Sequence, residues 1–491
     1  MSQLSIAHVP RPMRHFTPAQ HWMNDPNGLF FDGELYHLYF QYNPHGVEHG
    51  NMSWGHATSS DLVNWSEHPV AILHDERHDI FSGSIVIDRH NSSGLGDGST
   101  APVIALYTAA ARDGSNQAQA LAYSLDGGYS FTKYAGNPVL DRNSADFRDP
   151  KVFHYSGPAG DYWVMVAVEA VERRVLFYRS ENLLEWDELS GFGPQAACAG
   201  VWECPDLLEL PVEDSAETKW VLVLSLNPGG VAGGSGTQYF IGDFDGTSFT
   251  PDHEQPARDH TDFATLAEGA WLDWGRDNYA GVSFHGLPRN RCTLIAWMSN
   301  WDYARQLPHE RWRGSMTTAR KVDLLRTDTG YAVRQRFVGL PAAAAAESYG
   351  AGTHELALQG PTLIDVQARD LGEEPVRARF FRADGSPLSE LLLGAQQISH
   401  QRPSGRVDHE LYPSTQHMPL PPSDGRLCAQ LLLDAGSLEV LAAGGLRSLT
   451  DQLTGEETPA RVLLTIPGGA QSDVACTPLP QHGSTATQEL K

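Results

Sequence analysis

The sequence predicts an all-β protein made of a five-bladed β-propeller followed by a C-terminal antiparallel β-sandwich. The first reason is a pattern that recurs about every sixty residues: a polar turn, then an aromatic residue, then a strand. The second reason is that this pattern stops near residue 340 and gives way to short alternating strands without helical periodicity. Repeats of this length, each holding a few short strands, are typical of propeller blades.

Four copies of the pattern precede residue 255, in the segments SSDLVNW, SLDGGYSF, SENLLEW and DFDGTSF. Between them lie runs such as ELYHLYFQY, DYWVMVAV and KWVLVLSL, which have the Val, Ile and aromatic enrichment of strands. A fifth blade is expected around residue 315, where CTLIAWMSNW and SMTTARKVDLL supply strands. A large β-sandwich with coincidental hairpins is the alternative for this part of the chain.

We expect the propeller to occupy residues 1–338, a linker residues 339–348 and the sandwich residues 349–491. The linker contains PAAAAAES, an alanine-rich stretch that favours a helix. Beyond it, segments such as TLIDVQA, VRARFF and ARVLLTI predict antiparallel strands. No candidate site residue falls in this last part. We therefore expect it to be structural, covering an apolar flank of the propeller or forming a homodimer.

Composition excludes several classes of partner. The formal net charge of −25 would repel nucleic-acid phosphates and anionic lipids. No apolar run is long enough to span a bilayer. The first residues, MSQLSIAHVPRPMRHF, lack the basic and apolar regions of a signal peptide, so a cytoplasmic location is expected, with secretion left open. Five irregularly spaced cysteines predict neither a disulfide framework nor a zinc site.

Three acidic residues lie in unusual surroundings: Asp25 in WMNDPNG, Asp149 in FRDPK and Glu203 in VWECPD. Each alone has a plain explanation, respectively a surface turn, an ion pair with Arg148 and a solvated carboxylate. Together they fit glycoside hydrolysis, which needs two carboxyl groups on opposite sides of the scissile bond. For Glu203, the flanking Trp and Cys predict an apolar setting that would raise its pKa, as an acid catalyst requires.

These motifs resemble glycoside hydrolase family 32, which includes invertases, exo-inulinases and levanases. QYNP, WGHATSSDLVNW, FSGS, LNPGG, DWGRDNYAGVSF, WMSNWDYARQLP and GSLEV extend the resemblance over nearly the whole chain, in the same order. The resemblance implies a five-bladed propeller with a β-sandwich. It also implies that Asp25 is the nucleophile, Glu203 the acid/base and Asp149 a stabiliser of the transition state. No cofactor or metal is implied.

The resemblance also implies residues that line a fructosyl pocket. They are Asn24, Gln41, Trp54, Phe81, Ser82, Arg148 and Trp301. One departure is His49, which stands where many members have Trp and would make the leaving-group side more polar. Three tryptophans are expected to offer apolar faces to sugar rings: Trp22, Trp54 and Trp301.

The function expected from these residues is that of a retaining β-fructosidase that releases terminal non-reducing fructosyl units from sucrose, fructooligosaccharides, inulin or levan. A fructosyltransferase, which differs only in the acceptor, and a sucrose-6-phosphate hydrolase remain alternatives. Propeller enzymes that act on arabinan or xylan lack this set of motifs. A non-catalytic fructan-binding relative is disfavoured because all three acids are present.

Overall fold

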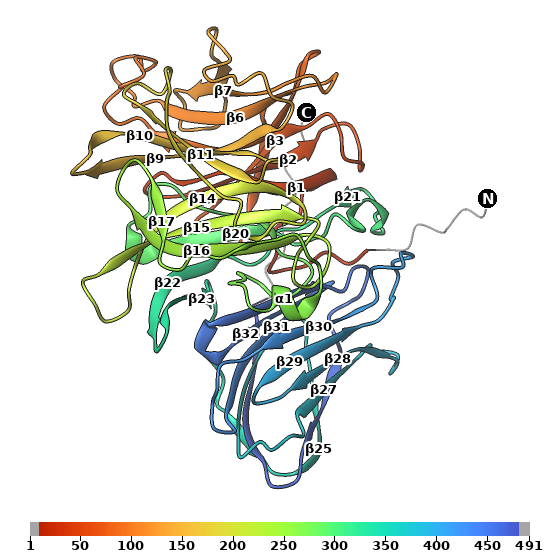
Figure 1. The fold of residues 1–491 in the computed structure, drawn as a ribbon. Coiled ribbons are helices and arrows are strands. Elements are labelled where there is room, and N and C mark those ends of the chain that lie inside the picture. The colour runs from red at the N-terminus through yellow and green to blue at the C-terminus, as the bar shows by residue number, and fades with distance from the viewer. Residues whose placement is uncertain (1–8, 481–491) are drawn as a thin grey trace.

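The structure is a computed structural model that describes residues 9–480. It is built almost wholly from strands, which confirms the prediction of an all-β protein (Figure 1). In the described part, the helical elements are one four-residue α-helix and three 3₁₀ turns. They are α1 (Phe263–Leu266), η1 (Arg289–Arg291), η2 (Ala304–Gln306) and η3 (Ala443–Gly445).

The first part of the chain forms five antiparallel sheets, each with four strands paired in the order in which they follow along the chain. The first sheet has an added edge strand, β21 (Trp312–Arg313), which runs parallel to β1. A separate pair of short strands, β13 (Ala196–Ala197) and β18 (Ala257–Arg258), is parallel. The sheets are β1 (His21–Phe31), β2 (Tyr36–Asn43), β3 (Ser53–Ser59) and β4 (Ser66–Ile72); β5 (His78–Ile87), β6 (Val103–Ala111), β7 (Gln117–Ser124) and β8 (Thr132–Lys133); β9 (Phe147–Gly157), β10 (Gly160–Glu169), β11 (Arg174–Ser180) and β12 (Asp187–Phe192); β14 (Val201–Pro211), β15 (Thr218–Asn227), β16 (Gly236–Phe244) and β17 (Phe249–Pro251); and β19 (Tyr279–Ser283), β20 (Thr293–Trp297), β22 (Arg320–Thr327) and β23 (Gly330–Phe337).

The recurring polar turn of the sequence joins the third and fourth strands of these sheets. In the first sheet, Ser59 Oγ accepts two backbone N–H groups and Asp61 Oδ1 accepts two more. In the third sheet, Ser180 and Asn182 make the same four bonds. The leucine after Asp61 and the one after Asn182 both have φ of 65°. The repeat therefore records a turn in which short polar side chains satisfy the exposed backbone.

The last part of the chain forms two six-stranded sheets, which lie below the others in Figure 1 in cyan and blue. The inward faces of their strands are apolar, as in the alternating pattern of β27. Their strands, in sheet order, are β24 (Glu347–Tyr349), β35 (Gln471–Pro478), β26 (Thr362–Arg369), β31 (Leu427–Asp434), β32 (Ser437–Ala442) and β33 (Arg447–Gln452); and β25 (Gly352–Ala357), β34 (Arg461–Ile466), β27 (Val376–Phe381), β28 (Pro387–Leu393), β29 (Gln397–Arg402) and β30 (Ser414–Pro419).

The helix expected in the alanine-rich stretch is wrong. Residues 341–346 have no regular secondary structure, and Glu347 already pairs with Val474 in β24 and β35. An isolated helix of so few residues is unstable in water. Pairing with a strand edge supplies hydrogen bonds that such a helix would lack.

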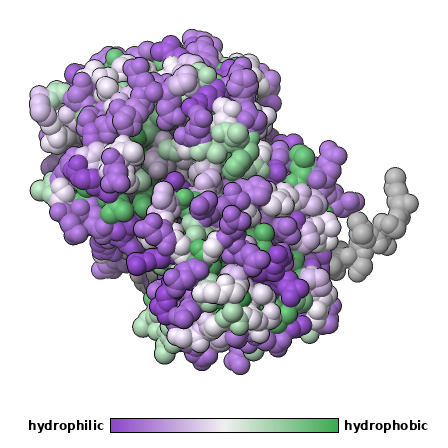
Figure 2. All heavy atoms as spheres, turned by 60° about the horizontal axis from the view of Figure 1, so that its bottom comes forward, coloured by the Kyte–Doolittle hydropathy of each residue, from purple (hydrophilic) through white to green (hydrophobic). Residues whose placement is uncertain are grey.

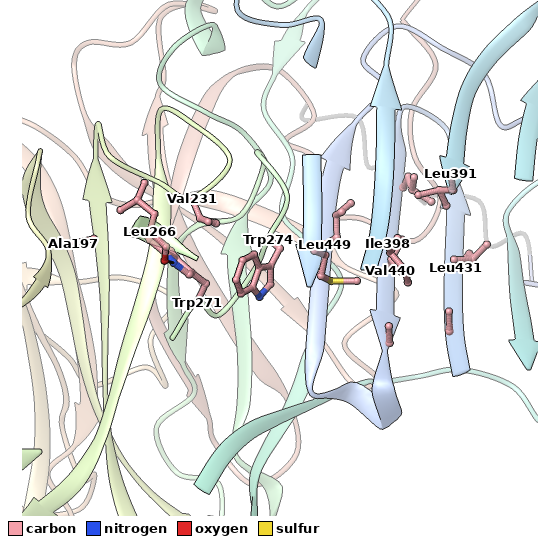
Figure 3. Packing of buried hydrophobic residues seen from close by; sticks show 14 of the residues in the cluster. Ala197, Val231, Leu266, Trp271, Trp274, Leu391, Ile398, Leu431, Val440 and Leu449 are labelled. Carbon is pink, nitrogen blue, oxygen red and sulfur yellow. Dashed lines mark hydrogen bonds between the residues drawn. The ribbon is translucent and has the colours of Figure 1, made fainter. Parts of the chain in front are cut away.

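The contact between the two groups of sheets is both apolar and ionic. Trp271 and Trp274 belong to the same buried cluster as Val440 and Leu449 of the C-terminal strands (Figure 3). Beside this cluster, Arg320 contacts Asp273, Glu439 and Thr450. The expectation of an apolar flank is therefore only half right, because charged side chains are buried there as well.

The surface is largely polar. On the face drawn in Figure 2, hydrophilic residues predominate and apolar residues occur in small groups. No helix of the described chain has the length and apolar character needed to cross a membrane. The signal-peptide expectation rests on residues 1–16. The first eight of these lie outside the described part of the chain.

Candidate active site

A pocket of about 580 Å³ opens among the first strands of four of the N-terminal sheets, β1, β5, β9 and β14, and residues 301–306 of the fifth. It is large enough for a small sugar and is lined mostly by polar side chains. Ten of the eleven residues predicted for the site line it. The full lining is Asn24, Asp25, Gln41, His49, Phe81, Ser82, Gln117, Arg148, Asp149, Val201, Glu203, Asn227, Trp301, Asp302, Arg305 and Gln306.

A β-bulge recurs at the same place in the first strand of every N-terminal sheet. Two residues lie opposite one residue of the neighbouring strand between Met23 and Pro26 in β1, and the same shift occurs in β5, β9, β14 and β19. The doubled residues include Asp25, Ser82, Asp149 and Cys204. Bulges bend a strand and redirect side chains, so the bulges in β1, β5 and β9 turn polar groups of three separate sheets toward one pocket.

Asp25 is held by neutral hydrogen-bond donors. Asn24 Nδ2 donates to its Oδ1 over 3.1 Å and Ser82 Oγ to its Oδ2 over 2.8 Å. The Cys204 thiol lies 3.6 Å from the same Oδ2. Burial, followed by the charge of Glu203, raises the pKa of Asp25 to about 6, although these three hydrogen bonds oppose the rise. The carboxylate is thus oriented with little counter-charge.

Asp149 has a left-handed backbone conformation, with φ of 63°. This conformation is uncommon outside glycine, but Asp and Asn adopt it more readily than other residues. Its backbone N–H donates to Thr108 Oγ1 over 2.9 Å, and its Oδ2 accepts the backbone N–H of Cys204 over 2.9 Å. Burial raises its pKa, and the neighbouring Arg148 opposes that rise. The Cys204 thiol, 3.7 Å away, lies between this carboxylate and that of Asp25.

Glu203 faces the pocket, with 22% of its side chain exposed. Arg148 Nε donates to Oε1 over 3.2 Å, and the Tyr279 hydroxyl donates to Oε2. Burial and the charge of Glu203 raise the pKa of Tyr279 well above its usual value, so the phenol stays a donor. The expected apolar setting of Glu203 is wrong. Successive residues of a strand point to opposite faces, so the flanking Trp202 is buried in a separate hydrophobic cluster.

A group of aromatic side chains, Trp22, His49 and Trp301, borders the pocket. Trp301 stacks on Trp22 with ring centroids 6.1 Å apart, and His49 meets both rings edge-on at 5.4 and 5.9 Å. The Arg305 guanidinium lies 5.9 Å from the Trp301 ring. Burial and the charge of Arg305 lower the pKa of His49 to about 4, so its imidazole is neutral at pH 7.

Two tryptophans expected at the pocket surface lie behind it instead. Trp54 is completely buried and its Nε1 donates to the carbonyl of Phe81 over 3.0 Å. Trp22 is 1% exposed and donates to Asn24 Oδ1 over 2.7 Å. Both rings therefore fix pocket residues rather than offer a face to a ligand. Trp22 lies in the first strand of its sheet and Trp54 in the third, and in a tightly packed protein such large rings fill space between sheets.

The sequence motifs contain several pocket residues that were not singled out. Asn227 lies in LNPGG, and Asp302 and Arg305 lie in WMSNWDYARQLP. Tyr279, whose hydroxyl donates to Glu203, lies in DWGRDNYAGVSF. Gln117, at the start of β7, has no such signal. Within residues 9–480, no group of three or more His, Cys, Asp or Glu side chains is arranged to hold a metal ion.

Comparison with known proteins assigns the family. The model of the glycosyl hydrolases family 32 N-terminal domain matches residues 15–336. An extracellular exo-inulinase of Aspergillus awamori is 36% identical over 94% of this chain and 93% of that protein. The levanase of Bacillus subtilis is 38% identical over 90% of this chain and 66% of that protein. The chain therefore belongs to glycosyl hydrolase family 32 and is a glycoside hydrolase.

Solved structures agree over the full length. A crystal structure of the exo-inulinase from Aspergillus awamori has a TM-score of 0.87 and 34% identity, covering 97% of this chain and 100% of that chain. The β-fructofuranosidase from Schwanniomyces occidentalis, complexed with fructosyl-erythritol, has a TM-score of 0.86 and 31% identity, covering 97% and 99%. Several relatives are named extracellular enzymes, which gives no support to the expected cytoplasmic location.

Proposed function

We propose that this protein is a retaining β-fructosidase that removes terminal non-reducing β-D-fructofuranosyl residues from sucrose, fructooligosaccharides, inulin or levan. The observation that supports this most directly is the meeting of Asp25, Asp149 and Glu203, from three different sheets, in one pocket. The names of the relatives, which are exo-inulinase, levanase and invertase, supply the fructosyl specificity.

The geometry fits a division of labour among the three acids. Asp25, oriented by Ser82 and Asn24, attacks the anomeric carbon of the fructosyl unit. Glu203, which is partly exposed and contacts Arg148 and Tyr279, protonates the departing oxygen and then activates water. Glu203 accepts hydrogen bonds from these two donors, and a proton on its carboxyl group can take the place of such a hydrogen bond as the reaction proceeds.

Asp149 acts without forming a bond to the substrate. Its fixed carboxylate, held by the backbone of Cys204, stabilises the cationic transition state and accepts hydrogen bonds from fructosyl hydroxyls. Fructose has a fully substituted anomeric carbon, so this transition state has strong oxocarbenium character. Trp301 and Phe81 offer apolar contacts to the sugar ring, while Gln41, Arg148 and Asn24 offer polar ones.

We infer the matching architecture: the five N-terminal sheets are the blades of a propeller, and the two six-stranded sheets form a sandwich. The regular succession of four antiparallel strands, with a first strand and a bulge at the same place in each sheet, supports the propeller. Domain limits at residues 1–338 and 349–491 and a homodimer remain predictions, which limited proteolysis and light scattering would test.

The decisive experiment compares purified enzyme on sucrose, sucrose 6-phosphate, inulin and levan, with products separated by chromatography. Free fructose released first from inulin or levan is expected, because the pocket surrounds one small sugar. Early oligosaccharides would contradict the removal of terminal units, and transfer products at high sucrose would favour a transferase. The anomer formed first, measured by NMR, tests retention: β-fructofuranose is expected, and the α-anomer would exclude it.

A further inference from the structure

One wall of the pocket is a short segment, residues 300–306. Trp301, Asp302, Arg305 and Gln306 all line the pocket. The residue in the middle of the segment, Tyr303, points away and is completely buried. The position of this buried ring therefore bears directly on where four pocket side chains lie.

Tyr303 is held by a side chain from the C-terminal sheets. Its hydroxyl donates to Asp277 Oδ1 over 2.5 Å and accepts from Arg402 Nη2 over 3.0 Å. Arg402, the last residue of β29, also donates from Nη1 to Asp277 Oδ2 over 2.5 Å. Its guanidinium is completely buried, and its Nε donates to the carbonyl of Tyr412 over 2.9 Å. The fork of the guanidinium thus fixes Asp277 and the Tyr303 hydroxyl together.

A second link joins the same segment to β33. Asp302, which lines the pocket, is bound by the Arg276 side chain. The backbone N–H of Arg276 donates to Asp451 Oδ1 over 2.9 Å. Asp451 is itself 2.5 Å from His400 Nδ1. Two consecutive residues of the wall are therefore linked to charged residues of the C-terminal sheets, Tyr303 directly through Arg402 and Asp302 indirectly through Arg276.

The start of the segment is anchored differently. Trp301 and Asn300 are bound by residues of the N-terminal part. The backbone N–H of Trp301 donates to Ser235 Oγ over 3.0 Å, and Asn300 Nδ2 donates to the carbonyl of Arg276 over 2.8 Å. These bonds hold the first turn within the N-terminal part. Arg402 contacts the segment further along the chain, at Tyr303.

We propose that Arg402 is a positioning residue for the substrate pocket, so that the C-terminal sheets set the geometry of one pocket wall through Arg402, Asp277 and Tyr303. The proposal rests on the β-fructosidase function proposed above. It assigns an effect on substrate binding to a region that the sequence predicts to be purely structural. The three carboxylates lie on β1, β9 and β14 and make no contact with Arg402, so the chemical step is affected less than binding.

The chain offers a matched control in Arg320. This arginine is also buried between the two parts of the molecule, where it contacts Asp273 and Glu439. Its partners include no residue of the pocket wall. Replacing either arginine by lysine removes the fork and keeps the charge, so both changes should lower thermal stability.

The test compares Arg402→Lys, Tyr303→Phe and Arg320→Lys by melting temperature and by kinetics on sucrose and inulin. We expect both lysine variants to melt earlier. Of these two variants, only Arg402→Lys should lower kcat/KM. The loss should be about ten-fold and mainly through KM, because the pocket wall is displaced. Tyr303→Phe keeps the ring and loses the hydroxyl, so KM should rise by a smaller factor.

Hydrogen exchange of peptides covering residues 300–306 gives a readout that needs no substrate. Exchange should be faster in Arg402→Lys than in Arg320→Lys at equal loss of melting temperature. Unchanged KM and unchanged exchange in Tyr303→Phe and Arg402→Lys would overturn the proposal; if Arg402→Lys does not fold, Tyr303→Phe decides. A wild-type enzyme that releases no fructose would refute the proposed function, whereas the exchange result would still judge the role of Arg402.

Discussion

Two groups of buried charged side chains in this molecule are built on opposite principles. The pocket group consists of Asp25, Arg148, Asp149 and Glu203. The interface group consists of His15, Asp273, Arg320, Asp434 and Glu439. In the pocket, one arginine faces three acids. At the interface, each acid receives a hydrogen bond from a cationic partner.

The difference is visible in two acids that are equally shielded from water. Glu439 contacts Arg320 and His15, and these partners overcome the effect of burial and lower its pKa to about 2. Asp25 accepts hydrogen bonds only from neutral groups, and burial with the nearby charge of Glu203 raises its pKa to about 6. A structural site therefore stabilises its charges, whereas a catalytic site leaves a charge under-compensated and reactive.

The largest effect expected from this contrast concerns Asp25, the proposed nucleophile. Asp25→Ala should lower kcat on sucrose by about 10⁴-fold or more, because no other group can form the covalent intermediate. The folded state should persist, since the residue lies at a pocket and is not part of the interface group. Steady-state kinetics with circular dichroism as a control measures both. A variant that retains near-normal turnover would remove Asp25 from the mechanism.

The next effect concerns proton transfer. Glu203→Ala should slow sucrose hydrolysis by about 10²–10⁴-fold, the usual contribution of a general acid. Fructosides with an activated leaving group need little protonation, so the loss on them should be much smaller. The ratio of the two rates is the measurement. Equal losses on both substrates would show that Glu203 acts in some other way.

A third effect tests the interface group. Glu439→Gln removes a charge that contacts Arg320 and His15, so the free energy of unfolding should fall by about 3–5 kcal/mol. The control is Glu355→Gln, which loses a half-exposed pair with Arg461 and should cost less than about 1 kcal/mol. Urea unfolding measures both variants. Equal losses of unfolding free energy would mean that burial of the interface group has no special role. The kcat of both variants should equal that of the wild type.

The sequence predicted the repeated elements well because their signals are local. The turn at Ser59 and Asp61 and the one at Ser180 and Asn182 are each closed by side chains within a few residues. The alanine-rich stretch misled because helix propensity is local, while the pairing of Glu347 with β35 is not.

Most of the candidate site could be predicted, since its acids stand in recognisable motifs. The exceptions have a spatial cause. Trp54 has the composition of a sugar platform, but its exposure depends on how neighbouring sheets pack. The link from Arg402 to Asp277 joins residues 125 positions apart. No pattern along one chain indicates such a pairing, so the part of the pocket wall that depends on it was missed.

The smallest expected effect is a change in folding stability on replacing Asp25 by a neutral residue. This change should stabilise the fold, whereas Glu439→Gln should destabilise it. The pKa of Asp25 rises from 3.8 to about 6 on folding, so the protonated form favours the folded state. That contribution is fully present below pH 3.8 and is lost as the pH rises through about 6. At higher pH the ionised carboxylate destabilises the fold by ~3 kcal/mol at most, the value that corresponds to this rise.

Asp25→Asn places a neutral side chain of the same shape in the pocket. It should therefore inactivate the enzyme and raise its melting temperature above pH 6, with little difference from the wild type near pH 4, because there the wild-type carboxyl is already protonated in the fold. Scanning calorimetry from pH 4 to pH 8 measures the difference. Glu439→Gln serves as the contrast, because it should be less stable than the wild type throughout this range. If Asp25→Asn melts earlier than the wild type at pH 8, the pocket charges stabilise the fold, and the contrast between the two groups fails at its central residue.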